Sequence, residues 1–230
     1  MNETLTLDLA ANQQRAFRTY ASVLLEWNAH VNLTAITDPQ EIYTKHFLDS
    51  LTLVRATRPA AGARVVDVGS GAGFPGVPLK IMFPQIDLTL VEATGRKAHF
   101  LRHLTDTLGL RDVKVINCRA EECGQDAAHR ERYDLVLARA VASMPTLAEY
   151  LLPLCRVGGQ CVAYKGENAP HETAQAEGAL RVLGGQLKQL VPIELPGVAE
   201  TRYLIVIDKV AATPDKYPRR PGIPAKRPLS

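Results

Sequence analysis

Val65-Val66-Asp67-Val68-Gly69-Ser70-Gly71-Ala72-Gly73-Phe74-Pro75-Gly76 is the stretch that decides the fold of this 230-residue chain. Its first part is a short β-branched run, which predicts a buried strand. The glycines that follow let the backbone turn sharply and let a ligand approach it without meeting a Cβ atom. The stretch therefore predicts a strand, a turn suited to a ligand, and a helix that runs to about residue 83.

Strand-like and helix-like segments alternate on the carboxyl side of this turn. Strands are predicted at residues 64–68, 87–91, 113–116, 133–138 and 159–164. Further helices are predicted at residues 96–108, 147–154 and about 173–183. This alternation is typical of an α/β protein with a mostly parallel sheet and helices on both faces. Two late strands, 186–194 and 202–208, are separated by a short loop with a Pro-Gly pair, which predicts an antiparallel hairpin at one edge.

A helical extension is expected before the sheet. Apolar side chains recur at three- and four-residue steps over residues 12–28, and a second helical pattern begins after Asp38-Pro39 and continues to Ala56. Aspartate can cap a helix, and proline suits its first turn. We therefore expect a single domain over residues 1–230, made of a helical extension (1–61), a Rossmann-like core (62–210) and a basic, proline-rich tail (211–230).

Composition narrows the class of protein. Hydrophobic residues make up 46% of the chain and charged residues 22%, as in ordinary globular proteins. The first twenty residues have neither a basic start nor an apolar run, so we expect no secretion signal, no membrane contact and a cytoplasmic location. The four cysteines lack the spacing of a zinc site, so we expect buried thiols and no metal.

The tail carries the positive surplus of the chain. The net charge is +3, and the remainder of the chain is close to neutral once this segment is left out. Its five prolines predict that it forms no regular element and lies extended over the body or stays mobile. The basic side chains are either solvated or in contact with RNA phosphates. The candidates for phosphate contact are Lys216, Arg219, Arg220, Lys226 and Arg227.

Two ligands compete for the glycine turn. Gly71, Gly73 and Gly76 form the spacing of a dinucleotide site, but Gly69 already follows the strand directly, and Pro75 lacks an amide hydrogen. Asp67, placed before the glycines, suits the amino group of a methionine moiety and favours S-adenosylmethionine. A tight turn without a ligand is the third interpretation. Glu92 ends the second strand, where a carboxylate can accept the hydroxyls of a ribose.

Several further motifs occur in a fixed order along almost the whole chain. They are Trp27-Asn28 with Val31-Asn32-Leu33-Thr34, residues 45–51, 67–79, Lys97 with Phe100-Leu101, residues 119–122, 138–142, Lys165-Gly166 and residues 217–222. In these motifs the chain closely resembles the bacterial small-subunit rRNA (guanine-N7) methyltransferase family, also called glucose-inhibited division protein B. The resemblance implies a Rossmann-like class I S-adenosylmethionine methyltransferase fold.

The resemblance also implies the reaction and the residues at its site. The expected reaction is methylation of N7 of a guanine in the decoding region of 16S rRNA, around position 527. 16S rRNA or the small ribosomal subunit is the expected partner, and no obligate protein partner is predicted. Taken together with the glycine turn, the expected cofactor residues are Asp67, Gly69, Gly71, Gly73, Phe74, Glu92, Ala120, Glu121 and Arg139.

Methylation at guanine N7 makes few chemical demands on the protein. The atom has an in-plane lone pair, so it can attack a methyl group without a general base, and the enzyme has to align the reactants. Arg139 and Lys165, at the ends of the fourth and fifth strands, are candidates for positioning the RNA. Arg139 could instead hold the methionine carboxylate, and Lys165 could be a solvated strand end. His46 and Asp49 could face the pocket or belong to a helix cap.

Two other classes of function remain open. A methyltransferase for a small molecule or a protein would share the glycine turn but not the N-terminal motifs. A non-catalytic RNA-binding or nucleotide-sensing protein would not need an intact turn with Glu92 in the ribose position. Methyl transfer from S-adenosylmethionine to ribosomal RNA is therefore the function that the sequence favours.

Overall fold

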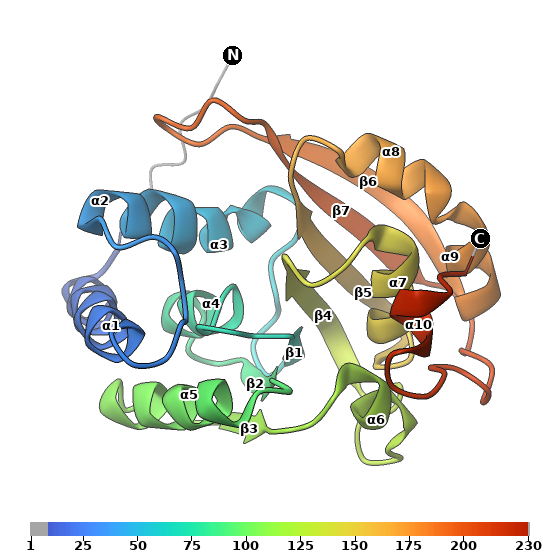
Figure 1. Cartoon of the computed structure of the whole chain (residues 1–230), viewed down its shortest axis with the longest axis horizontal. Helices are drawn as coiled ribbons and strands as arrows, with labels where there is room; N and C mark the ends of the chain where they lie inside the picture. The colour runs from blue at the N-terminus through green and yellow to red at the C-terminus, as the bar shows by residue number, and fades with distance from the viewer. Residues whose placement is uncertain (1–8, 230) are drawn as a thin grey trace.

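The computed structural model describes residues 9–229, so expectations placed on residues 1–8 and 230 lie outside it. Seven strands form one mixed sheet in the order β3-β2-β1-β4-β5-β7-β6 (Figure 1). Their bounds are β1 Arg64–Val68, β2 Asp87–Val91, β3 Val113–Ile116, β4 Tyr133–Arg139, β5 Cys155–Lys165, β6 Gly185–Ile193 and β7 Arg202–Lys209. Strands β1 to β5 pair in parallel, and β7 runs antiparallel between β5 and β6. The predicted parallel sheet with an antiparallel edge hairpin is confirmed.

Successive side chains of the buried strands pack into two separate apolar cores, one on each face of the sheet. Val65 packs into the core that lies against α1 (Ala11–Asn28), α4 (Gly76–Met82) and α5 (Gly95–Thr107). Its neighbour Val66 packs into the core on the opposite face. The helices of that face are α6 Ala120–Gln125, α7 Met144–Leu151, α8 Ala169–Gln175 and α9 Glu177–Leu183. Side chains of a strand point alternately to its two faces, so this pattern follows from the period of two.

A single helical run covers the first core beside the glycine turn. It consists of α2 (Pro39–Glu41), the π-helical segment η1 (Ile42–Leu48), α3 (Asp49–Leu51) and the 3₁₀ segment η2 (Thr52–Arg55). The Asp38 carboxylate accepts the Glu41 amide at 2.9 Å, which confirms the predicted start. The π-helical turn was not predicted, because a helical apolar pattern does not reveal a widened turn. Such turns are frequent at functional sites.

Two expectations about the helices need correction, and one short helix was not expected. The helix predicted at 173–183 is two helices that meet at Ala176, and α6 was not predicted, because six residues are too few to show a period. The expectation that the tail forms no regular element is wrong at α10 (Ile223–Lys226). Its Pro224 lies in the first turn, where an amide hydrogen is not needed.

The rest of the tail lies over the body, which is the first of the two arrangements expected from the sequence. Tyr217 is buried, and the Arg130 guanidinium donates to the carbonyls of Thr213 and Tyr217, both at 2.7 Å. No helix in residues 9–229 has the length and hydropathy needed to cross a membrane. The cysteines are free thiols, and Cys118 alone of the four is not fully buried.

Candidate functional site

The glycine turn connects β1 to α4 at the carboxyl edge of the sheet. Gly69 and Gly71 have φ angles of 70° and 57°, which glycine adopts without strain. A Cβ atom on Gly69 would come within 2.8 Å of the Val141 side chain, so a larger residue would clash there. A Cβ on Gly71 would meet only the Gly69 carbonyl, at 3.8 Å. Gly71 therefore borders free space, which leaves room for a ligand next to the backbone.

Six backbone amides of this turn are already used within the protein. Their acceptors are the Val91 and Ser70 carbonyls and the carboxylates of Glu92 and Asp67. The six donors are the amides of Gly69, Ser70, Gly71, Gly73, Phe74 and Gly76. A pyrophosphate is bound at a glycine turn by free amide donors. The geometry therefore argues against the dinucleotide interpretation.

Glu92 holds the glycine turn from the end of β2. Its carboxylate accepts the Gly71 amide at 2.9 Å and the Thr94 amide at 2.7 Å, and the residue is 6% exposed. Each oxygen keeps a second lone pair that can accept a ligand hydroxyl. Asn117, which the sequence reasoning missed, donates from its side chain to the Glu92 carbonyl at 2.8 Å. Its place directly after a predicted strand was the available signal.

Asp67 lies underneath the glycine turn. One carboxyl oxygen, Oδ2, accepts the Gly76 amide at 2.9 Å, while Oδ1 has no hydrogen-bond partner among residues 9–229. Burial raises the pKa of Asp67 to about 7, against the opposing effects of the Gly76 amide and the Arg139 cation. Asp67 thus accepts a hydrogen bond from the first residue of α4. Its contact with a methionine amino group stays a prediction.

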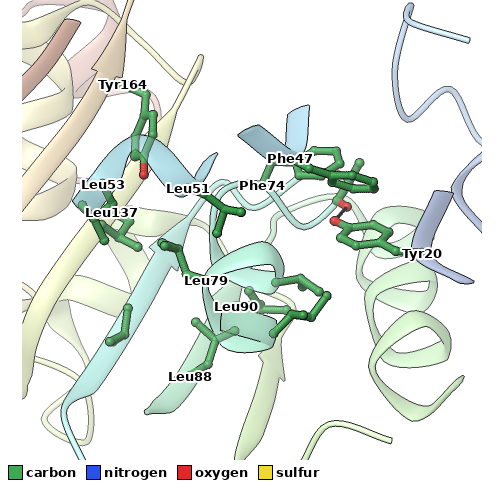
Figure 2. Close-up of a cluster of buried hydrophobic side chains, with 14 of the residues drawn as sticks. Tyr20, Phe47, Leu51, Leu53, Phe74, Leu79, Leu88, Leu90, Leu137 and Tyr164 are labelled. Atoms are coloured by element: carbon green, nitrogen blue, oxygen red, sulfur yellow. Dashed lines mark hydrogen bonds between the residues drawn. The ribbon is translucent and has the colours of Figure 1, made fainter. Parts of the chain in front are cut away.

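A second group of predicted residues meets beside the turn. The Arg139 guanidinium at the end of β4 lies 2.6 Å from the Asp49 carboxylate and 4.8 Å from the centre of the Phe74 ring. His46 stacks on the same ring with centroids 4.5 Å apart. Burial and the Arg139 charge lower the pKa of His46 to about 4, so its ring is neutral at neutral pH. Figure 2 shows Phe74 next to Phe47 and Tyr20 at one end of the first core.

Tyr20 is another residue that sequence reasoning placed only in the core. Its hydroxyl donates to the Ala72 carbonyl at 2.6 Å, and its ring stacks on Phe74 at 5.2 Å. A Cβ on Gly73 would lie 2.6 Å from this hydroxyl, so the third glycine makes room for Tyr20. The helical extension therefore fixes the glycine turn. The aromatic residue with a polar group in the apolar stripe of α1 was the available signal.

The remaining predicted residues divide between the sheet edge and the tail. Lys165 at the end of β5 is paired with Glu172 at 2.6 Å and is 11% exposed, so it is not a solvated strand end. Ala120 and Glu121 begin α6, and the Glu121 carboxylate accepts the Gly222 amide of the tail at 2.8 Å. The Glu121 side chain thus contacts the tail.

The five basic residues of the tail have two different environments. Arg219 forms a two-pronged ion pair with the fully buried Glu149, with distances of 2.9 and 2.6 Å. The other four are exposed: Lys216, Arg220, Lys226 and Arg227. Arg219 therefore anchors the tail to α7, and only the other four present their charges to a partner. Within residues 9–229 no cluster of histidine, cysteine or acidic side chains could hold a metal ion.

This sheet order, with its inserted antiparallel strand and glycine turn, defines a class I S-adenosylmethionine-dependent methyltransferase fold. A solved S-adenosylmethionine-dependent methyltransferase from Aquifex aeolicus superposes with a TM-score of 0.57, at 14% identity, over 81% of this chain and 97% of that one. The model of the rRNA small subunit methyltransferase G family matches residues 13–197. The chain belongs to this family.

Curated relatives agree over nearly the full length. The ribosomal RNA small subunit methyltransferase G of Roseiflexus castenholzii is 52% identical over 97% of this chain and 94% of its own length. The protein of the same name from Alkaliphilus metalliredigens is 46% identical over 95% of this chain and 91% of its own length. The family resemblance found in the sequence motifs is thereby confirmed.

Proposed function

We propose that this chain transfers the methyl group of S-adenosylmethionine to N7 of a guanine in 16S rRNA, in the region of position 527. Family membership supports the cofactor, the RNA and the guanine. The observation that supports N7 is that none of the side chains in direct contact with Arg139, which are His46, Asp49 and Phe74, is a free base. His46 is neutral, and its ring nitrogens contact Thr34 and Arg139 at 2.8 and 3.4 Å. Asp49 and Lys165 are both held in ion pairs.

The residues at the sheet edge fit S-adenosylmethionine. The free space at Gly71 admits a ligand, and the Glu92 carboxylate can accept the ribose hydroxyls. When bound, the cofactor supplies an electrophilic methyl group on a sulfonium. We assign its binding to the predicted set: Asp67, Gly69, Gly71, Gly73, Phe74, Glu92, Ala120, Glu121 and Arg139. Within this set, the Asp67 carboxylate accepts the Gly76 amide of the turn, and the Glu121 carboxylate accepts the Gly222 amide of the tail.

The surroundings of Arg139 suit a purine that becomes positively charged. The guanine gains a positive charge when N7 is methylated, so an uncompensated cation beside it would oppose the reaction. The Asp49 carboxylate at 2.6 Å compensates the Arg139 charge. The neutral His46 ring adds no charge, and it stacks on the buried Phe74 ring. Arg139, Asp49, His46 and Lys165 therefore position the substrate, and none of them has to move a proton.

The exposed tail cations are the proposed contacts to more distant phosphates. Lys216, Arg220, Lys226 and Arg227 are all exposed, and the tail that carries them lies against α6 and α7 (Figure 1). Cation contacts to phosphates supply affinity that falls with salt. Because ribosomes are assembled in the cytoplasm of bacteria, the proposed substrate also places the reaction there.

Labelled S-adenosylmethionine tests this function directly. Small subunits from cells that lack the gene for this protein are incubated with enzyme, and N7-methylguanine is mapped by strand scission. One modified guanine near position 527 is expected, and subunits from cells that contain the enzyme should accept no label. Cofactor binding without transfer to any ribosomal RNA would reject the proposal in favour of a small-molecule or protein substrate.

A further inference from the structure

A small cavity opens beside Arg139 at the carboxyl edge of the sheet. Its volume is about 130 Å³, and its charged lining residues are Asp49, Arg139, Lys165 and Arg202. The sheet brings them together, because Arg139 pairs with Tyr164 in register, and Lys165 pairs with Tyr203, which follows Arg202. Antiparallel β7 thus starts where parallel β4 and β5 end.

Arg202 is the one of these three cations without a close acidic partner. Arg139 and Lys165 each have a carboxylate oxygen at 2.6 Å, from Asp49 and Glu172. The Nε atom of Arg202 is buried and has no hydrogen-bond partner among residues 9–229, and the Asp49 carboxylate is 3.9 Å away. Three cations therefore share two carboxylates. A buried donor without an acceptor is unfavourable, so the cavity is suited to a ligand with negatively charged oxygens.

The backbone of the cavity wall is also unusual. Ala140, which lines the cavity directly after β4, has a φ angle of 56°. A residue with a Cβ atom is strained in this left-handed region. Such outliers concentrate at binding sites, where the surrounding structure enforces them. The strained backbone of Ala140 is independent of the charges, and it also indicates a binding site at this cavity.

We propose that this cavity binds a phosphate group of the RNA strand next to the target guanine, and that Arg202 contacts it. The inference rests on the function proposed above and assigns a residue to it. A guanidinium offers paired donors that match the oxygens of a phosphate. Arg139 lines the cavity and also contacts Phe74, so a phosphate there lies one side chain away from the proposed methylation site. Lys165 is already neutralised, so Arg202 supplies the free charge.

Substitution of Arg202 tests the phosphate contact. Binding of Arg202→Gln to small subunits from cells lacking the gene is measured over a range of salt concentrations, together with kcat and KM for methylation. We expect about tenfold weaker binding, a matching rise in KM and an unchanged kcat. The slope of log affinity against log salt should become shallower by about 0.7 to 0.9, the value for one lost phosphate contact. Arg202→Lys should keep the wild-type slope.

The control is Arg181→Gln on α9, an exposed residue next to Gly184 and Gly185 at the opposite edge of the sheet, which should match the wild type. An unchanged salt slope for Arg202→Gln would overturn the phosphate contact, and a fall in kcat at constant KM would instead place the guanine base in the cavity. If Arg202→Gln does not fold, a shallower slope for Arg202→Lys overturns the proposal. Failure of the wild type to methylate these subunits would reject the proposed function itself, and the subsite with it.

Discussion

Arg139 and Asp49 form an ion pair in which Nη1 and Oδ2 are 2.6 Å apart and the side chains are 12% and 3% exposed. The two residues are 90 positions apart and join the end of β4 to the helical run over the first core. Removal of two charges from water is costly, and their attraction offsets that cost only while both are present. The pair therefore ties the helical extension to the sheet at the proposed site.

Loss of one member of this pair should cost more than loss of both. Asp49→Ala leaves the Arg139 cation without its carboxylate, so we expect the free energy of unfolding to fall by about 3 kcal/mol. The double variant Asp49→Ala/Arg139→Ala leaves neither charge unpaired, so it should be more stable than Asp49→Ala and than the sum of the two single effects predicts. Urea unfolding of the four proteins measures this, and additive effects would show that the two side chains do not stabilise each other.

The Glu92 carboxylate is expected to contribute directly to cofactor affinity. Glu92→Gln keeps the size of the side chain but loses the charge and one of its strong acceptors for amides and ribose hydroxyls. We expect affinity for S-adenosylhomocysteine to fall by about 1 to 3 kcal/mol. Titration calorimetry measures the change, and an unchanged affinity would remove Glu92 from the ribose position.

Asp67 should make the stability of the protein depend on pH. Its pKa of about 7 in the folded protein exceeds the ordinary value of about 4 for an unfolded chain. Between these values the folded state keeps a proton that the unfolded state has released, so the free energy of unfolding falls as pH rises through this window. Asp67→Asn removes the ionisation and should gain on the order of 2 kcal/mol relative to wild type between pH 4.5 and pH 8. Parallel urea unfolding curves at the two pH values test this, and a constant difference would contradict it.

Substitution of two adjacent arginines in the tail should affect different properties, stability for Arg219 and RNA binding for Arg220. Arg219→Gln leaves the buried Glu149 carboxylate without its cation and should lower the free energy of unfolding by about 3 kcal/mol. Arg220→Gln changes an exposed side chain and should leave the melting temperature unchanged. The salt slope of RNA binding should instead become shallower by about 0.7 to 0.9 for Arg220→Gln. A destabilised Arg220→Gln, or an unchanged salt slope for it, would contradict this division of roles.

The strands could be predicted from the sequence because their buried runs are rich in β-branched residues. Glycine or proline near several of their ends also marks where they begin or stop. The predicted bounds of β1, β2 and β3 agree with the structure at both ends. Elements of one or two turns, such as α6 and α10, are too short for a periodic signal. The two-helix break at Ala176 lies within a continuous helical pattern and depends on packing.

The location of the site could be predicted from one rule, that ligands bind at the carboxyl ends of parallel strands. That rule correctly brought Arg139 and Lys165 to one edge of the sheet. It could not supply their partners, because Asp49 comes from the helical extension and Glu172 from α8. It also overlooked Arg202, since the start of an antiparallel strand lies at the same edge. The anchoring role of Arg219 depends on Glu149, 70 residues away in the sequence.

The position of β7 between β5 and β6 has a consequence for the order of folding. Strand β6 is hydrogen-bonded to β7 and not to β5, so it has no place in the sheet until β7 has joined. The loop of residues 194–201 is short, so β6 and β7 can form a local hairpin that then docks on β5 as one unit. Arg202 is the first residue of β7, so it lines the cavity only when β7 is paired with β5. The glycine turn has its partners on other elements, Glu92 at the end of β2 and Tyr20 on α1, so the geometry of the turn does not depend on the hairpin, whereas the cavity beside Arg139 does.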